Sequence, residues 1–405
     1  MVAAARIYGQ AERGAILYAM GITQHTTGVP NVMSCANLQM LLGNMGVLGG
    51  GVNPLRGQNN VQGACDMGGL PNVFPAYQVV TVEANNEKFA NAWGKKMPDK
   101  VGYTLTDMVQ AMMDGKLKAL YVIGENPKLS DPDQHHISTA FEKLELLVCQ
   151  DIFLSETAEQ ADVVFAAVSV AEKEGTFTNS ERRCMKVNKA IDPMGDALTD
   201  WEIISRLSTA MGYKMNYKGA EEIFTEMASL TPSYAGMSYE RLGLDGLQWP
   251  CPDSDHPGTP FLHAKQFSRG KGLFHAVEYL DPAEMPDDEY PYFLTTGRTF
   301  SHYHTGTMTR VSPNLDAEQK TGYVEIHPED AEKLALKDGD MVKLTTRRGA
   351  IQAPARISEQ IKPGLLFVPF HFAENPANAL TNSAFDPIAK IPEYKVCAVK
   401  VEKAA

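Results

Sequence analysis

Short apolar runs alternate with helix-like segments in the first half of the chain. Residues 3–12 and 31–42 have apolar side chains at helical spacing. Continuous apolar runs between helices are typical of parallel strands buried on both faces of a sheet. The pattern therefore predicts an α/β fold with parallel sheets. The predicted strands lie in AILYAMG (15–21), KALYVIGENP (118–127), LELLVCQD (144–151) and VVFAAVS (163–169).

The pattern changes after the last of these runs. Residues 199–213 form an amphipathic helix, with Asp200 placed to cap it and Gly212 placed to end it. Residues 214–285 are rich in Pro, Gly and Asp, which predicts a connecting region with little regular core. From Tyr290 onward, strand-like runs separated by turn signals such as KDGD and RRG predict a compact β-rich domain, a barrel. These runs are YFLTTG, GYVEIH, MVKLTTRRGAIQAPARI and GLLFVPF.

Polar side chains follow the predicted parallel strands. In open α/β sheets, ligands bind in the crevice beyond the carboxyl ends of the strands. Ordinary loop chemistry explains any one such residue, but a succession of polar strand ends favours a large polar ligand. The G-x-G-x-x-G fingerprint is absent, so the sequence does not support a standard NAD-binding fold. The polar ends carry Gln24 and His25, Glu125 and Asn126, Gln150 and Asp151, and Glu172 and Lys173.

Composition narrows the class of protein. The chain has 405 residues, of which 44% are hydrophobic, with a formal net charge of −12 and a pI of about 5.4. Lys and Arg are scattered, so no basic patch suits a nucleic acid, and no apolar run is long enough to span a membrane. The six cysteines contain no C-x-x-C pair, which argues against a zinc or iron–sulfur motif and indicates the reduced thiols of a cytoplasmic protein. The start has no signal-peptide core and reads as a helix already under way, as expected of a chain that begins inside a domain.

Two segments combine amides, glycines and few charges. Residues 51–69, GVNPLRGQNNVQGACDMGG, hold one full positive charge, Arg56. This segment is too polar for a core strand, too interrupted for a helix and too weakly charged for an ordinary linker. A plain interpretation is a glycine-rich surface loop. Residues 371–387, HFAENPANALTNSAFDP, form a second amide-rich loop, which we expect to cover a ligand or a partner.

A third polar segment, TTGRTFSHYHTGTMTR (295–310), precedes that loop. Its small hydroxyls, glycines and Arg298 suit contacts with phosphate oxygens, through backbone N–H groups and a guanidinium fork. His302 and His304 have a spacing that metal ligands can have, but no third ligand is nearby in the sequence. We therefore expect no metal ligand in this chain.

A series of motifs runs in order along nearly the whole chain. They are MGITQHTTG (20–28), NPLRGQNNVQGACDMG (53–68), GENP (124–127), QD (150–151), EKEG (172–175), TDW (199–201), TGRTFSHYHTGTMTR (296–310), NALTNSAFDP (378–387) and PEYKVCAVKVE (392–402). This series resembles the carboxy-terminal part of the catalytic subunit of molybdenum- or tungsten-dependent formate dehydrogenases. These are bis-molybdopterin guanine dinucleotide oxidoreductases. The segment 53–68 separates formate dehydrogenases from the nitrate reductases of the same superfamily.

The resemblance implies a fold and a domain order. Parallel-sheet, Rossmann-like domains would precede a C-terminal β-barrel of the double-psi, aspartate-decarboxylase-like type. The implied regions are 1–75, part of an α/β cofactor-binding domain incomplete at its N-terminus; 76–213, an α/β domain binding one guanine dinucleotide arm; 214–285, an irregular connecting region; and 286–405, a barrel that binds molybdopterin dinucleotide.

The resemblance also implies a cofactor and its contacts. Bis-molybdopterin guanine dinucleotide with Mo or W would be wrapped by residues 51–69, and Arg56 is the implied catalytic residue, which meets the substrate. A carboxylate such as Asp151 or Asp200 can accept two hydrogen bonds from a guanine edge. Positions implied to contact the dinucleotide arms are Met20, Gln24, Gln58, Asn126, Gln150, Asp151, Lys173 and Asp200. The other arm is expected at Thr296, Gly297, Arg298, His302, His304, Thr305, Phe370, Asn378 and Lys395.

The chain departs from the family pattern at its start. It lacks the four-cysteine motif of a [4Fe–4S] cluster and the selenocysteine or cysteine, followed by histidine, that ligates the metal. The cluster is therefore expected in a missing N-terminal portion. Expected partners are that portion, electron-transfer subunits of iron–sulfur, flavin or hydrogenase type, and formate or CO₂. Three hypotheses stay open: a formate dehydrogenase active with the missing portion, an inactive cofactor-binding scaffold, and another oxidoreductase such as a nitrate reductase.

Overall fold

The computed structural model describes residues 1–404, which form two compact units. Each unit is assembled from segments that are separate in the sequence. Unit 1 comprises residues 1–20, 32–104 and 167–277, and unit 2 comprises residues 21–31, 105–166 and 278 onward. Over residues 1–404, no helix is long and apolar enough to cross a membrane, and the six cysteines form no disulfide.

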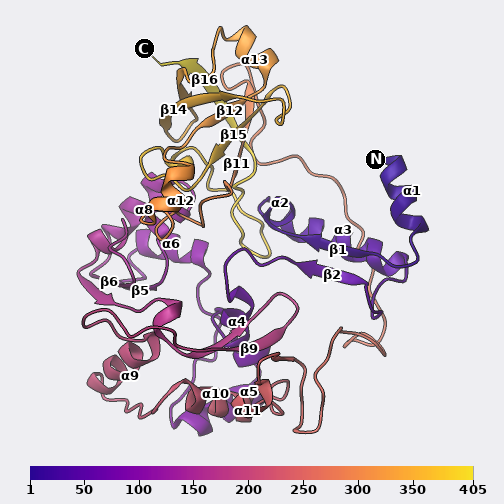
Figure 1. The fold of residues 1–405 in the computed structure, drawn as a ribbon, viewed down its shortest axis with the longest axis vertical. Helices are drawn as coiled ribbons and strands as arrows, with labels where there is room; N and C mark the ends of the chain where they lie inside the picture. Colours follow the sequence, from indigo (N-terminus) through magenta and orange to yellow (C-terminus); the bar gives the residue numbers. More distant parts are fainter. Residues whose placement is uncertain (405) are drawn as a thin grey trace. The chain divides into compact units, whose positions relative to one another are not determined.

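A two-stranded parallel sheet lies in the first part of unit 1. β1 (Ala15–Tyr18) pairs with β2 (Gly51–Pro54), so the apolar run 15–21 contains a strand, as predicted. Residues 51–69 were predicted to be too polar for a core strand, and the strand that Gly51–Pro54 form is only half-buried. Pairing with β1 satisfies backbone groups that a polar loop would leave to water. Figure 1 shows both strands at the indigo end of the chain.

Two helices flank these strands in the sequence. α1 (Val2–Gln10) precedes β1 and has no buried residue, and α3 (Gly28–Leu41) connects the two strands. Both were predicted from helical spacing. The short α2 (Met20–Thr23) begins where the apolar run ends, which makes the strand shorter than the run.

The rest of the segment 51–69 is also ordered. α4 (Val61–Asp66) follows the loop that carries Arg56, so the prediction that the segment is too interrupted for a helix was wrong. Asn60 precedes α4 with a left-handed φ of 61°, and its Oδ1 accepts a hydrogen bond from Thr178 N at 2.9 Å. Glycine is required at position 63, because a Cβ there would lie 2.0 Å from Asn60 Oδ1. The segment is thus held against a strand.

That strand belongs to an antiparallel sheet of unit 1, in the order β10-β9-β8. β8 (Gly175–Thr178) and β9 (Arg183–Val187) form a hairpin, and β10 (Leu247–Gln248) pairs with β9. The remaining elements of unit 1 are β3 (Val73–Phe74), β4 (Gln78–Val79), α5 (Glu83–Trp93), α9 (Asp200–Ala210), α10 (Ala220–Leu230), α11 (Tyr239–Leu242) and the 3₁₀ turns Pro75–Tyr77 and Val170–Glu172.

Two predictions for this region need correction. The region 214–285 was expected to have little regular core, yet α10 and α11 pack their buried side chains against Tyr234 and Cys251. Its Gly and Pro residues lie in turns between these elements, and the prediction holds only for residues 252–285, which contain no helix and a single isolated bridge. The N-cap of α9 is Thr199, which forms a capping box with Glu202, and not Asp200. The helix ends before Gly212, as predicted, where φ is 91°.

Unit 2 contains the predicted parallel sheet. β5 (Ala119–Ile123), β6 (Leu146–Asp151) and β7 (Val163–Ala166) pair in parallel in sequence order. α6 (Leu105–Met113) and α8 (Gln134–Phe141) contribute Met112, Ile137 and Phe141 to its buried core. The short α7 (Pro127–Ser130) and the 3₁₀ turn Ala158–Gln160 follow β5 and β6.

A closed barrel forms the rest of unit 2, as predicted from the C-terminal pattern (Figure 1). Its strand order is β11-β15-β12-β14-β13-β16, with parallel pairs β11–β15 and β12–β14 and antiparallel pairs elsewhere. The strands are β11 (Tyr292–Gly297), β12 (Val324–Ile326), β13 (Met341–Thr345), β14 (Ala350–Ile357), β15 (Leu365–Pro369) and β16 (Cys397–Lys403). Short helices α12 (Pro313–Glu318), α13 (Pro328–Lys333) and the 3₁₀ turn Ala377–Ala379 connect them.

Candidate functional site

In unit 1, Arg56 lies half-buried in the loop between β2 and α4. Its Nε and Nη2 atoms donate hydrogen bonds to Gln62 Oε1 at 3.3 and 3.1 Å, and its backbone N–H donates to Ser180 Oγ at 3.2 Å. Within residues 1–404, no carboxylate forms an ion pair with Arg56. The guanidinium therefore has its charge available for a small anion.

The parallel pairing of β1 and β2 brings two predicted segments to one edge of the sheet. Tyr18 lies opposite Pro54, and Leu55 N donates to Tyr18 O at 2.7 Å. Met20, two residues beyond β1, is half-buried at this edge, and Gln58 is half-buried in the loop of Arg56. Their cofactor contacts remain predictions.

Lys173 and Asp200, which the sequence separates, meet in unit 1 as an ion pair. The side chains are 26% and 36% exposed, so a ligand can reach them. Thr199 supplies the cap of α9, and the Asp200 carboxylate accepts a hydrogen bond from Lys173. The arrangement suits a guanine edge, whose N–H groups need a carboxylate acceptor.

In unit 2, β5 and β6 end side by side, as predicted, with Ile123 opposite Gln150. The Asn126 amide is 2% exposed; its Nδ2 donates to Glu156 Oε2 at 2.6 Å, and its Oδ1 accepts from Thr157 N at 3.1 Å. Gln150 is fully buried and accepts a hydrogen bond from the Tyr121 hydroxyl. The amides thus shape the edge of the sheet through protein contacts.

Another predicted side chain, Asp151, lies at the end of β6. Its Oδ1 accepts a hydrogen bond from the Ile152 N–H at 2.7 Å. Gln24, which was also assigned to a strand end, follows α2 in unit 2 and is half-buried. Contacts of either residue with a dinucleotide remain predictions.

His371, which the sequence analysis missed, holds the loop after β11. It is fully buried, its Nε2 accepts from Thr299 N at 2.8 Å, and its Nδ1 donates to the His304 carbonyl. Burial lowers the pKa of His371 to about 4, so the ring stays neutral with its proton on Nδ1. The one available sequence signal was its position directly after the strand run that ends in Phe370.

His302 is buried and makes contacts inside the loop. Its Nε2 donates to Gln319 O at 2.6 Å, and its Nδ1 accepts from Thr309 Oγ1 at 3.1 Å. Thr305 Oγ1 lies 2.8 Å from Thr307 Oγ1. In the described part of the chain, no three His, Cys, Asp or Glu side chains converge as metal ligands do. The hydrogen bonds of His302 give it a role in holding the loop.

Three cationic or protonatable side chains lie around the predicted barrel site. Burial lowers the pKa of Arg298 and of His304, and it lowers the pKa of Lys395 to about 8. The charge of Arg298 contributes to the lowered pKa values of both His304 and Lys395. One carboxylate, Glu125, lies 3.7 Å from His304 Nδ1. Buried positive groups that lower one another's pKa values are suited to bind an anion such as a pyrophosphate. A bound anion would raise the pKa of each group.

The neighbouring backbone and ring positions support this fit. Thr299 Oγ1 is buried and has no hydrogen-bond partner within residues 1–404. The Phe370 ring centroid lies 5.9 Å from the Arg298 guanidinium. Thr296 Oγ1 donates to Tyr394 O at 2.9 Å, and Gly297 leaves room for the Phe367 ring, which a Cβ would approach to 2.5 Å. A phosphate oxygen would supply the acceptor that Thr299 needs.

Asn378, predicted to bind the cofactor, has an evident packing role. Its Nδ2 donates to the carbonyls of Leu129 and Ser130, both at 2.9 Å, and the side chain is 4% exposed. These bonds hold α7 against the loop that follows the barrel strand β15. A cofactor contact of Asn378 remains a prediction.

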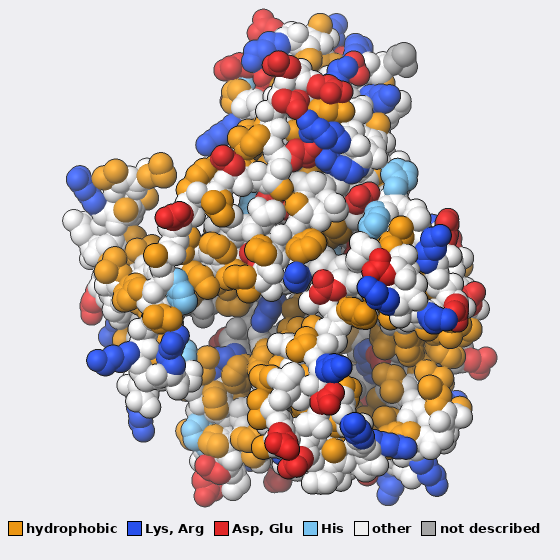
Figure 2. Space-filling model, turned by 180° about the vertical axis from the view of Figure 1, so that it is seen from behind, with side chains coloured by type: hydrophobic (Ala, Val, Ile, Leu, Met, Phe, Trp, Pro, Cys, Tyr) orange, Lys and Arg blue, Asp and Glu red, His pale blue; other side chains and the backbone are white. Residues whose placement is uncertain are grey.

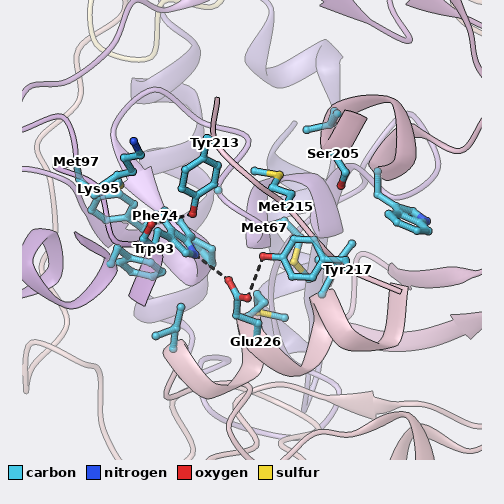
Figure 3. Close-up of a pocket in the computed structure, with 18 of the residues that line it drawn as sticks. Met67, Phe74, Trp93, Lys95, Met97, Ser205, Tyr213, Met215, Tyr217 and Glu226 are labelled. Atoms are coloured by element: carbon cyan, nitrogen blue, oxygen red, sulfur yellow. Dashed lines mark hydrogen bonds between the residues drawn. The ribbon is translucent and has the colours of Figure 1, made fainter. Parts of the chain in front are cut away.

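Unit 1 also contains an apolar cavity of about 690 Å³ (Figure 3). Aromatic and methionine side chains such as Phe74, Trp93 and Met215 line it. Its carboxylate, Glu226, accepts hydrogen bonds from Trp93 Nε1 and the Tyr217 hydroxyl, both at 2.9 Å. Met67 and Gly68 of the segment 51–69 contribute to the lining, but within residues 1–404 it includes none of the residues singled out as cofactor contacts. The apolar walls do not suit a charged dinucleotide.

Two family models match the chain. The model described as "Molybdopterin oxidoreductase" matches residues 4–210, and the model described as "Molydopterin dinucleotide binding domain" matches residues 292–398. The second match contains most of the barrel and the cationic group around Arg298. The first contains Arg56, Lys173, Asp200 and the parallel sheets.

Curated relatives match over the whole chain. The F420-dependent formate dehydrogenase 1 subunit alpha of Methanococcus maripaludis is 56% identical over 407 residues, covering 100% of this chain and 60% of the relative. The F420-dependent formate dehydrogenase subunit alpha of Methanocaldococcus jannaschii is 52% identical, and formate dehydrogenase H of Escherichia coli is 41% identical. The chain thus spans 60%, 60% and 57% of the length of these relatives.

A solved structure has the same fold over most of the chain. Acetylene hydratase from Pelobacter acetylenicus superposes with a TM-score of 0.60, over 80% of this chain and 50% of that one. The two sequences are 19% identical, so this likeness concerns the fold alone.

Proposed function

The chain belongs to the molybdopterin oxidoreductase family, and we propose that it is the carboxy-terminal part of a formate dehydrogenase catalytic subunit. The observation that carries this proposal is the 56% identity with a formate dehydrogenase alpha subunit over the whole chain. Because the chain spans 60% of that relative, activity is proposed only for the chain together with the remainder of the subunit. The reaction is the reversible oxidation of formate to CO₂, a proton and two electrons.

The proposed cofactor is bis-molybdopterin guanine dinucleotide with Mo or W. When bound, it would accept the two electrons of formate. In unit 2, Arg298, His304 and Lys395 would hold phosphate oxygens of one arm, and their lowered pKa values support an anionic ligand there. In unit 1, the Lys173–Asp200 pair would open to receive a guanine edge. A [4Fe–4S] cluster is proposed in the remainder of the subunit.

We propose Arg56 as the residue that binds and orients formate. Formate has two equivalent oxygens, which a guanidinium can meet with two parallel N–H···O bonds. The charge of Arg56 is not cancelled by an ion pair within residues 1–404, which leaves it able to pair with the substrate. Conversion of the carboxylate to neutral CO₂ removes that attraction, so the product is released.

The barrel is proposed to be of the double-psi, aspartate-decarboxylase-like type. Its six strands close through a mixture of parallel and antiparallel pairs, which supports this type over a simple up-and-down barrel. The loop that carries Arg298 leaves the end of β11, so its rigid support is the barrel itself.

The remainder of the catalytic subunit is the first proposed partner. Several large hydrophobic side chains near the start of unit 1 are exposed, and Figure 2 shows hydrophobic side chains open to solvent between charged ones. Ile7 and Leu41 are both 72% exposed, and Leu48 is 64% exposed. We propose that these exposed side chains contribute to the surface that meets the remainder of the subunit. Electron-transfer subunits are proposed to receive the two electrons.

Isotope-labelled formate tests the proposal. The chain co-expressed with the rest of its subunit is expected to convert ¹³C-formate to ¹³CO₂ when an artificial electron acceptor is supplied. Nitrate offered with a reduced dye is the control substrate and is expected to stay unreduced. Nitrate reduction without formate oxidation would overturn the proposal in favour of another oxidoreductase of the family.

A further inference from the structure

A fully buried carboxylate, Asp66, lies four residues after Gln62 on α4. Positions four apart in a helix lie on the same face, which brings the two side chains together. Gln62 Nε2 donates to Asp66 Oδ1 at 2.8 Å, and Gln62 Oε1 accepts both hydrogen bonds from the Arg56 guanidinium. A continuous line of hydrogen bonds thus joins the buried carboxylate to Arg56.

Three further side chains donate hydrogen bonds to the Asp66 carboxylate. Tyr77 OH donates to Oδ1 at 3.1 Å, Tyr234 OH donates to Oδ2 at 2.6 Å, and Trp249 Nε1 donates to Oδ2 at 2.8 Å. Burial and the Asp66 charge raise the pKa values of both tyrosines, so both keep the protons that they donate. Burial raises the pKa of Asp66, and these hydrogen bonds oppose that rise.

The acceptor character of Asp66 decides which way the Gln62 amide faces. A glutamine can present either its oxygen or its NH₂ group to a neighbour. Here the carboxylate requires the NH₂ group, and the same Nε2 also donates to Tyr77 OH at 2.8 Å. The amide oxygen must then face Arg56. If the amide turned over, its N–H groups would face the N–H groups of the guanidinium, which would repel it.

The backbone at Tyr77 has an unfavourable conformation. Ala76 and Tyr77 both have positive φ, at 53° and 63°, although neither is glycine. Such a conformation costs free energy and persists where surrounding contacts hold it. The hydroxyl of Tyr77 meets both Gln62 and Asp66, so these contacts are the ones that the backbone conformation serves.

We propose that Gln62 and Asp66 are positioning residues for formate binding: Asp66 fixes the Gln62 amide, and the amide oxygen fixes the Arg56 guanidinium. The inference rests on the proposed role of Arg56. With Nε and Nη2 tied to one oxygen, the guanidinium plane is set, and its remaining N–H groups face a defined direction. Formate then meets an oriented fork and not a mobile cation, which lowers the entropy lost on binding.

The test measures formate binding to the complete subunit without electron acceptor, from ¹³C-formate line broadening, together with kcat and KM. Gln62→Leu removes the acceptor while leaving Arg56 and Asp66 in place, and it is expected to weaken formate binding about tenfold, the scale of a hydrogen bond to a charged group. Asp66→Asn is expected to weaken it similarly, because an amide there introduces a donor among donors and turns Gln62. The double variant is expected to bind formate no more weakly than Gln62→Leu alone, because Asp66 acts through Gln62.

Tyr234→Phe is the matched control. It removes a donor from the other carboxylate oxygen, so it is expected to lower the melting temperature without changing formate affinity. If Gln62→Leu binds formate as the wild type does, the inference is overturned, whether or not Asp66→Asn folds. Additive losses in the double variant would also overturn it, since Asp66 would then act by another route. Arg56→Lys separates a failure of this inference from a failure of the proposed function. Unchanged formate binding in that variant contradicts the proposed role of Arg56 itself.

Discussion

At the residue scale, the charges of this chain act through their surroundings. Arg56 and Arg298 are both half-buried arginines, but their neighbours differ. Arg56 is held by an uncharged amide, which leaves its charge for a substrate. Arg298 lies near Lys395 and His304, whose pKa values it lowers, which suits a ligand with more than one negative charge. The sequence placed both arginines in polar loops, but it could not show these neighbours.

Replacement of Arg56 tests whether its charge and planar guanidinium bind formate. Arg56→Lys keeps the charge and loses the planar fork, so KM for formate is expected to rise and kcat to fall together. Arg56→Ala is expected to lose about 3 kcal/mol or more of transition-state stabilisation, the scale of a broken buried ion pair. Steady-state kinetics normalised to metal content measure both effects. Unchanged kcat/KM per bound metal, with less cofactor, would mean that Arg56 only holds the pterin.

Asp131, which lies 5% exposed after α7, gives unit 2 a pH dependence. Its pKa is raised to about 7, mainly by burial and to a smaller extent by the charge of Glu125. The folded state therefore keeps a proton that the unfolded chain has already released, so stability falls as pH rises from about 4 to about 7. Asp131→Asn is expected to remove this loss, worth up to about 4 kcal/mol above pH 7.

The measurement is the melting temperature of Asp131→Asn and wild type from pH 4.5 to 8. The difference between them is expected to grow with pH and to level off above about 7. Asp192→Asn, at a side chain that is 91% exposed, serves as the surface control. A difference that does not vary with pH would show that Asp131 is ionised throughout.

At the element scale, apolar periodicity predicted the parallel strands β5, β6 and β7 and the barrel strands. Those strands form because their apolar side chains are buried, and the apolar positions can be read from the sequence. Polar elements were missed for the opposite reason. β2 and α4 contain few apolar residues and form because β1 and β8 supply partners for their backbone and for Asn60. Such partners are distant in the sequence, so no local pattern reveals them.

The same limit applies to the site. Lys173 and Asp200 were chosen from motifs, and the structure pairs them. His371 was missed, because its value comes from two contacts with the loop after β11, which no spacing rule predicts. Asn126 and Asn378 were chosen for their amides, and those amides are engaged by the protein itself.

The start of α9 allows the cap and the proposed guanine contact to be separated. Thr199→Ala removes the capping box and is expected to lower stability by about 1 kcal/mol without changing pterin content. Asp200→Ala leaves the cap intact but removes the proposed acceptor of the guanine edge, at a cost of about 1–3 kcal/mol of cofactor binding. Pterin and metal per protein, and the melting temperature, are measured for both variants in the complete subunit. Equal pterin content in Asp200→Ala and wild type would remove Asp200 from the proposed site.

At the scale of the whole molecule, each unit carries its own group of proposed contacts. Unit 1 supplies Arg56 and the Lys173–Asp200 pair, and unit 2 supplies the cationic group of Arg298, His304 and Lys395. A variant that removes one group is therefore expected to leave the fold of the other unit intact, since each unit has its own buried core.

The exposed apolar side chains of unit 1 lead to a prediction for the isolated chain. The chain spans 60% of a formate dehydrogenase alpha subunit to which it is 56% identical, and α1 has no buried residue. We expect the chain alone to show no formate-dependent dye reduction, because the electrons of formate need acceptors that we assign to the remainder of the subunit.

Co-expression with that remainder is expected to restore turnover and to lower the binding of a hydrophobic dye, as Ile7, Leu41 and Leu48 become covered. The complex carrying Arg56→Ala is the control, since it should cover the same surface and still fail to oxidise formate. Substantial turnover by the chain alone would contradict this division of roles, because electron uptake and transfer would then have to lie within residues 1–405.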